Sequence, residues 1–230
     1  NSQCQGYRRY GGALASWESN PERTYFILVS PYRYTGVGAG SFDLSLTNFT
    51  TAANDECAAA IGPVEPGENL ITGNTEFALF DGEYSCSYGS DSPGVWYTVV
   101  GAGDPIRADL CSNYTNFDTE LSIYGGSCDF LTCVGGNDDS YCGLSSSIQW
   151  VAEAGVMYFI RVHGHGSGNS GTFGLTISTF IPAPNDQCEG ALPVLADGSV
   201  VEGSTAESTF DRNAPFCDTY YGNDSAGVWY

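Results

Sequence analysis

The chain has 230 residues, and its hydrophobic fraction of 42% is enough to build packed cores, which excludes a largely disordered protein. Its 27 acidic residues against seven basic ones give a net charge of −20, which excludes a nucleic-acid partner and attracts cations, although acidity also serves solubility alone. Nine cysteines without CxxC pairs favour disulfides over a zinc site and predict an extracellular or cell-surface location.

No stretch approaches the roughly 20 apolar residues that span a bilayer, so we expect no membrane insertion within this sequence. We expect any export signal or anchor to lie outside it.

An internal repeat with a period of about 131 residues organises the chain. The segment 54–57 (Asn-Asp-Glu-Cys) recurs at 185–188, and Gly-Val-Trp-Tyr at 94–97 recurs at 227–230. In the other direction, segments 150–160 and 173–177 match segments 17–27 and 42–46. The sequence therefore predicts the C-terminal part of one repeat at 1–49, a complete repeat at 51–180 and the N-terminal part of a further repeat at 181–230. We expect these residues to belong to a longer array.

Within the complete repeat, apolar residues alternate with polar ones in a series of short segments. A continuously apolar segment at 95–100 predicts a central strand. Alternation predicts further strands at 106–110, 121–123, 148–152, 158–162 and 173–177, separated by Gly-rich turns. We therefore predict an all-β fold of tandem antiparallel β-sandwich domains, jelly-roll-like and stapled by disulfides.

Cysteine spacing suggests a pairing scheme. Cys57 and Cys86 have the same separation as Cys188 and Cys217, which predicts one disulfide in each pair. Cys128 and Cys133 are close enough for a small looped bridge, and Cys111 would then pair with Cys142 by elimination. Cys4 aligns with Cys133, and its partner would precede Asn1.

The order of motifs resembles the bacterial pre-peptidase C-terminal domain and its cysteine-rich relatives in secreted repeat proteins. The resemblance rests on Asn-Asp-x-Cys, Gly-Val-Trp-Tyr, and the segments 117–124, 137–139, 154–162 and 171–177, and it covers residues 54–180 and part of both flanks. It implies a β-sandwich appended to secreted proteins, usually non-catalytic, sometimes calcium-stabilised or binding carbohydrate or protein. The six cysteines per repeat depart from the typical bacterial form, which leaves the specific binding role open.

Loop carboxylates and amides are the candidate metal ligands. They are Asp118, Asn137, Asp138, Asp139 and Asp55, whose motif returns at Asp186. Calcium takes six to eight oxygen ligands, and loops of this composition can supply them, whereas the alternative is that these residues only cap turns. His163 and His165 form a His-x-His pair that could hold a metal on a strand, although the neighbouring glycines favour an exposed loop.

Three sequons predict N-glycosylation at Asn48, Asn113 and Asn223. Nucleophile elbows, HExxH motifs and phosphate-binding Gly loops are absent from the sequence, so we expect no catalytic residues and no enzyme activity.

The sequence therefore favours a non-catalytic structural repeat that builds a stalk, fibre or filament, with short Pro-containing linkers such as 180–184. Its expected partners are neighbouring copies of itself or other extracellular matrix components. The alternative is an adhesive or carbohydrate-binding accessory module, in which glycans bind exposed aromatic side chains. The candidates are Tyr7, Tyr10, Tyr32, Tyr34, Tyr220 and Tyr221.

Overall fold

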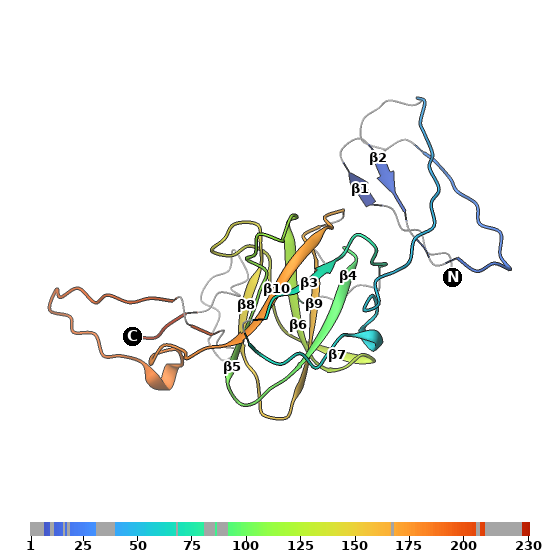
Figure 1. Cartoon of the computed structure of the whole chain (residues 1–230). Helices are drawn as coiled ribbons and strands as arrows, with labels where there is room; N and C mark the ends of the chain where they lie inside the picture. Colours follow the sequence, from blue (N-terminus) through green and yellow to red (C-terminus); the bar gives the residue numbers. More distant parts are fainter. Residues whose placement is uncertain are drawn as a thin grey trace.

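A computed structural model of the chain describes residues 7–9, 12–15, 17, 19–30, 40–67, 69–80, 86, 92–166, 168–205, 208–209 and 227–230. A β-sandwich occupies the centre, and the N- and C-terminal flanks leave it on opposite sides (Figure 1). Its elements in chain order are β1 (Tyr7–Arg9), β2 (Gly12–Leu14), the 3-10 turn η1 (Cys57–Ala59), β3 (Ile71–Asn74), β4 (Gly94–Val100), β5 (Pro105–Asp109), β6 (Thr119–Ser127), β7 (Phe130–Asn137), β8 (Ser147–Val151), β9 (Met157–Gly164), β10 (Thr172–Thr179) and η2 (Cys188–Gly190).

Two four-stranded sheets make the sandwich, with strand orders β3-β10-β5-β8 and β4-β9-β6-β7. Every strand pair in both sheets is antiparallel. The all-β two-sheet sandwich predicted from the alternating segments is therefore confirmed. Among the described residues, no helix is long and apolar enough to cross a membrane.

The hydrophobic core lies between the sheets and is built from alternate positions of the strands. Its larger members are Val95, Tyr97, Val99, Ile106, Leu110, Leu121, Ile123, Trp150, Tyr158, Ile160, Val162, Phe173, Leu175 and Ile177, each at most 5% exposed. These are the positions that the period of two assigns to the inner face, which explains why the alternation located the strands.

The prediction that segment 95–100 is a central strand is wrong, because β4 stands at the end of its sheet. Its outer edge is nevertheless hydrogen-bonded, since Ile61 and Val64 donate their N–H groups to Trp96 O and Thr98 O. Both faces of β4 are also covered. Val95 faces the main core, and Trp96 packs with Tyr124 in a second cluster on the outer face of the sheet. Double coverage, not a central position, accounts for the continuous apolar run.

Three disulfides stabilise the sandwich, and they join Cys57 to Cys128, Cys86 to Cys133, and Cys111 to Cys142. The predicted Cys57–Cys86 and Cys128–Cys133 bridges are therefore wrong. Cys57 and Cys86 each attach separately to the β6–β7 hairpin, where Cys128 lies in the turn and Cys133 lies on β7. The equal spacing of cysteines in two repeats shows only that the repeats match. The predicted Cys111–Cys142 pair is confirmed, although the elimination that predicts it depends on two wrong pairings.

The predicted bridge from Cys188 to Cys217 cannot be followed, because Cys217 lies outside the described residues. Cys188 itself is exposed. The three disulfides indicate that the chain folds in an oxidising compartment.

The start of the complete repeat and the C-terminal flank share their local geometry. Asn54 Nδ2 donates to Trp96 O at 2.8 Å, and Asn185 Nδ2 donates to Trp229 O at the same distance. The carboxylates that follow also match, because Asp55 Oδ1 accepts from a backbone N–H 24 residues later and Asp186 Oδ1 from one 23 residues later. The repeated sequence motif therefore makes the same contacts twice.

The N-terminal flank shares a second piece of geometry with the complete repeat. Ring centroids lie 5.9 Å apart both in Trp17–Tyr25 and in Trp150–Tyr158. Each tyrosine hydroxyl also accepts a backbone N–H from five residues earlier, Asn20 for Tyr25 and Glu153 for Tyr158.

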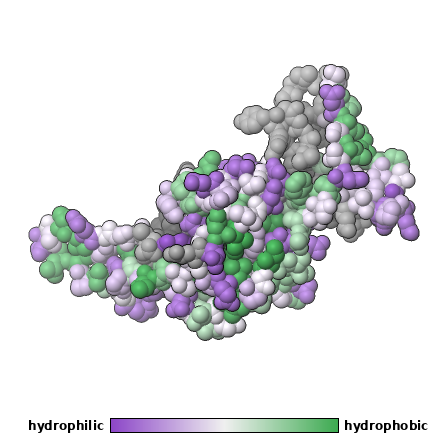
Figure 2. Space-filling view, in the orientation of Figure 1, coloured by the Kyte–Doolittle hydropathy of each residue, from purple (hydrophilic) through white to green (hydrophobic). Residues whose placement is uncertain are grey.

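Segments 25–27 and 42–46 match strands of the complete repeat in sequence but are not strands in the structure. Their side chains are exposed, and Phe26 and Leu46 are 94% and 70% exposed. Hydrophobic side chains lie on the surface of both flanks in Figure 2. Among the described residues, no strand pairs with these segments, so they lack the backbone hydrogen bonds that β9 and β10 make with neighbouring strands in the sandwich.

Candidate metal centre

Three neighbouring strand ends bring the candidate metal ligands together. Asp118 precedes β6, while Asp138 and Asp139 follow β7. Because β6 and β7 are antiparallel, with Leu121 opposite Asn137, the start of one strand meets the end of the other. The end of β9 reaches the same place, since Thr119 lies opposite Gly164.

The three aspartates converge closely. One carboxylate oxygen from each of Asp118, Asp138 and Asp139 lies within 4.8 Å of the other two. Asp118 and Asp138 are half-buried, and Asp139 is exposed. The Oδ1 atoms of Asp118 and Asp138 are buried and accept no hydrogen bond. A buried carboxylate oxygen without a donor is costly unless a cation compensates its charge.

Two further titratable side chains border the aspartates, and sequence reasoning did not place either of them here. His165 Nδ1 lies 3.0 Å from Asp138 Oδ2 and 3.8 Å from Glu120 Oε2. Its backbone N–H donates to Asp118 O, which holds the end of β9 against the start of β6. Glu120 is fully buried. The register of β6 against β9 brings these residues together, and the sequence alone does not give that register.

Burial is the main electrostatic effect on the cluster. It raises the pKa of Asp118, which His165 lowers and Asp139 raises by smaller amounts. Burial also raises the pKa of Asp138, which His165 lowers and Asp139 and Asp118 raise by smaller amounts. The ionised carboxylates are therefore disfavoured chiefly because they are withdrawn from water.

The geometry suits an oxygen-ligated divalent cation. Oxygens that share one Ca²⁺ at 2.3–2.6 Å lie at most about 5 Å apart, and the three aspartate oxygens meet that limit. Two of the three residues also carry a buried oxygen that accepts no hydrogen bond, and a cation at these strand ends would compensate their charge.

Two of the predicted ligands have other roles. Asn137 Oδ1 accepts from Ser147 N at 2.9 Å and ties the end of β7 to β8. Asp55 Oδ1 accepts from Leu79 N at 2.6 Å, and its side chain is buried. Both are contacts between distant parts of the chain, 10 and 24 residues apart, and not the local turn caps that the sequence offered as the alternative. Asp55 does not belong to the aspartate group.

A buried polar row lies next to the cluster on the outer face of the β4-β9-β6-β7 sheet. Ser122 Oγ is 3.0 Å from His163 Nε2, and His163 Nδ1 is 3.9 Å from Glu120 Oε2. This is the order of groups in a serine–histidine–carboxylate triad. All three residues are at most 1% exposed, so a substrate cannot reach the hydroxyl. The expectation of an exposed loop at His163 is wrong, because β9 continues through Gly164 and the outer face of its sheet is covered.

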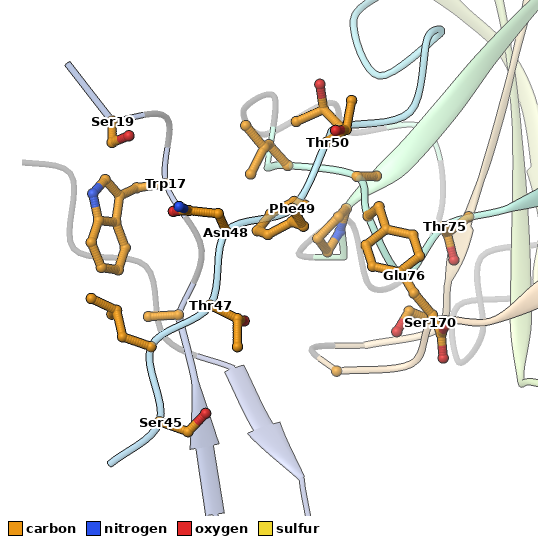
Figure 3. A pocket seen from close by; sticks show the side chains of 18 of the residues that line it. Trp17, Ser19, Ser45, Thr47, Asn48, Phe49, Thr50, Thr75, Glu76 and Ser170 are labelled. Atoms are coloured by element: carbon orange, nitrogen blue, oxygen red, sulfur yellow. The ribbon is translucent and has the colours of Figure 1, made fainter. Parts of the chain in front are cut away.

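A groove of about 890 Å³ separates the N-terminal flank from the sandwich. Figure 3 shows Trp17, Asn48 and Phe49 on the flank side, and Thr75, Glu76 and Ser170 on the sandwich side. Asn48, a predicted glycosylation site, lines this groove and is exposed. Asn113 is also exposed, whereas Asn223 lies outside the described residues.

The structure does not describe the side chains of the tyrosines that the alternative hypothesis offers as glycan-binding candidates. Tyr10, Tyr32, Tyr34, Tyr220 and Tyr221 lie outside the described residues, and Tyr7 is described only as a backbone position in β1. Comparison with known proteins does not add a function. No known protein family matches the chain, and no curated protein matches it either.

Proposed function

We propose that this chain is a non-catalytic structural module of an extracellular or cell-surface protein, in which tandem β-sandwiches build a stalk, fibre or filament. The recurrence of local geometry carries this proposal, because both flanks repeat contacts of the complete sandwich. Three disulfides in one sandwich suit a structural protein that is exposed to an oxidising exterior. The resemblance to the pre-peptidase C-terminal domain supports the same assignment.

Electron microscopy of the native secreted material tests this proposal. We expect long assemblies with a regular axial repeat set by one sandwich. Dispersed compact particles at all concentrations would contradict the structural role and favour a binding module.

We also propose that the aspartate cluster binds a divalent cation, with calcium as the first candidate. The two buried oxygens of Asp118 and Asp138 support this assignment, because no group in the described part of the chain donates a hydrogen bond to them. A bound ion would pin the ends of β6 and β7 and stabilise the hairpin to which two disulfides attach. The role of the ion is therefore structural.

Thermal unfolding with calcium and with a chelator tests the cation site. We expect calcium to raise the Tm of the wild type, because an ion that binds only the folded state stabilises it by mass action. The double variant Asp118→Asn/Asp138→Asn should lose this shift. Asp129→Asn, which removes an exposed carboxylate from the β6–β7 turn, should keep it. An equal calcium shift in all three proteins would show that the ion binds elsewhere.

An adhesive or carbohydrate-binding role is the second candidate, and the groove favours it. Trp17 and Tyr25 line the groove and are 37% and 42% exposed, so their rings could stack on a sugar. Their counterparts Trp150 and Tyr158 are core residues, which favours a packing role for the pair. Binding to a glycan array that disappears in Trp17→Ala would support this role, and absence of binding to any glycan would exclude it.

A further inference from the structure

The outer face of the β5–β8 pair carries a polar unit that contacts the C-terminal flank. Arg107 on β5 lies directly opposite Gln149 on β8, and both side chains are half-buried. In the orientation in which both its oxygen and its nitrogen form hydrogen bonds, the Gln149 amide accepts through its oxygen from Arg107 Nε at 2.8 Å and from Nη2 at 2.6 Å. The two side chains therefore hold each other in place.

This unit makes two contacts with the chain that follows the sandwich. The Arg107 guanidinium lies 5.1 Å from the centroid of the Phe180 ring, in cation–π geometry. Gln149 donates its amide N–H to Ser208 O, 59 residues further along the chain. Both ends of the segment from 180 to 208 are thus attached to the same face of the sandwich.

Ser208 is followed by a residue that contacts the Asn-Asp motif of the flank. The next residue, Thr209, donates its backbone N–H to Asp186 Oδ1, and its hydroxyl donates to Asp186 Oδ2. Ser208 and Thr209 are both fully buried. Gln149 is therefore linked, through Ser208 and Thr209, to the motif that opens the next repeat.

We propose that Arg107 and Gln149 form a docking surface for the following repeat and fix its orientation relative to the sandwich. The partner is a segment of the same chain, Phe180 to Thr209, attached through a cation–π contact and an amide hydrogen bond. Pro182 and Pro184 restrict the connection between them. This inference rests on the proposed tandem architecture. It implies that consecutive sandwiches keep a constant angle to each other.

A distance measurement between two nitroxide labels tests the docking surface. The labels are carried on unnatural amino acids at Tyr114 in the sandwich and Ser199 in the flank, which are both exposed, so that no cysteine is added. In the wild type we expect a single narrow distance distribution by pulsed electron resonance. In Arg107→Ala/Gln149→Ala the distribution should widen at least about twofold, because only the linker then limits the motion.

Arg23→Ala, which removes an exposed arginine from the other flank, is the matched control and should leave the distribution narrow. Retention of the three disulfides and of the near-ultraviolet circular dichroism shows that the double variant is folded. A broad distribution in the wild type, or a narrow one that survives in the double variant, would overturn the inference. The labels report on single chains, so failure to find filaments would count against the proposed function without changing this result.

Discussion

The complete sandwich and the two flanks contain the same motifs but bury them to different extents. Trp150 is 4% exposed and its counterpart Trp17 is 37% exposed, and Phe173 is fully buried whereas Phe42 is 64% exposed. Asn54 and Asn185 nevertheless donate to equivalent carbonyls, those of Trp96 and Trp229, 42 and 44 residues further along the chain. The two repeated motifs thus make the same contact with each other in both copies, whereas burial depends on the strands that the rest of a repeat supplies.

The tryptophan pair provides the largest test of this contrast. Trp150→Ala should destabilise the protein by about 3–5 kcal/mol, because it removes a buried aromatic side chain and leaves a cavity. Trp17→Ala should cost under about 1 kcal/mol, since much of its ring already contacts solvent. Urea unfolding monitored by circular dichroism measures both. Equal losses of stability would mean that the flank is packed as tightly as the sandwich.

The dependence of stability on acid pH tests the burial of the polar row, which the exposed flanks do not share. Burial, followed by the charge of Arg161, holds the pKa of His163 well below its usual value of 6.5. The unfolded chain therefore takes up a proton at pH values where the folded chain does not. Stability should fall as pH drops below about 6.5, by up to about 1.4 kcal/mol for each pH unit from this residue.

Replacing His163 by Gln, which cannot protonate, should remove this part of the pH dependence even if the variant is less stable overall. His165→Gln is the control, because the ring of His165 is 40% exposed. Free energies of unfolding from pH 7 to pH 5 give the two slopes. An unchanged slope in His163→Gln would show that other groups control acid unfolding.

The aspartate cluster gives the smallest effect. In the presence of a chelator, Asp138→Asn should stabilise the protein at pH 7 by under about 1 kcal/mol, because it removes a half-buried charge that burial, and to a smaller extent the neighbouring aspartates, disfavour. The raised pKa of Asp138 means that the wild-type carboxyl takes up a proton as pH falls. The advantage of the variant should then shrink with decreasing pH.

Stability curves of the wild type, Asp138→Asn and the exposed control Asp129→Asn measure this effect. An advantage that is the same at pH 7 and pH 4, or that Asp129→Asn shares, would show that the charge of the Asp138 carboxylate is not its origin.

Sequence patterns predicted six of the eight strands of the sandwich, because an inner-face position is apolar whatever lies on the outer face, but they did not predict β3 and β7. The patterns did not predict that polar side chains are buried where the outer face of a strand is also covered. Glu120 and Ser122 follow the alternation of an exposed face, yet both are buried beneath further chain. Alternation distinguishes the two faces of a strand and does not reveal whether a second layer covers the polar one.

The candidate metal centre was only partly predictable. Asp118, Asp138 and Asp139 could be selected because they flank strands, but Asp55 and Asn137 look the same in sequence and accept backbone hydrogen bonds from distant residues instead. Which strand ends meet depends on the pairing of β6 with both β7 and β9. The disulfides failed for the same reason, since spacing reports the period of the repeat and not proximity in space.

Disulfide mapping of the native protein by mass spectrometry tests most directly the claim that consecutive repeats share one structure. We predict peptides that join Cys57 to Cys128, Cys86 to Cys133 and Cys111 to Cys142. Because Cys188 occupies the position of Cys57, it should not be joined to Cys217. Peptides that join Cys57 to Cys86 and Cys188 to Cys217 would contradict the account.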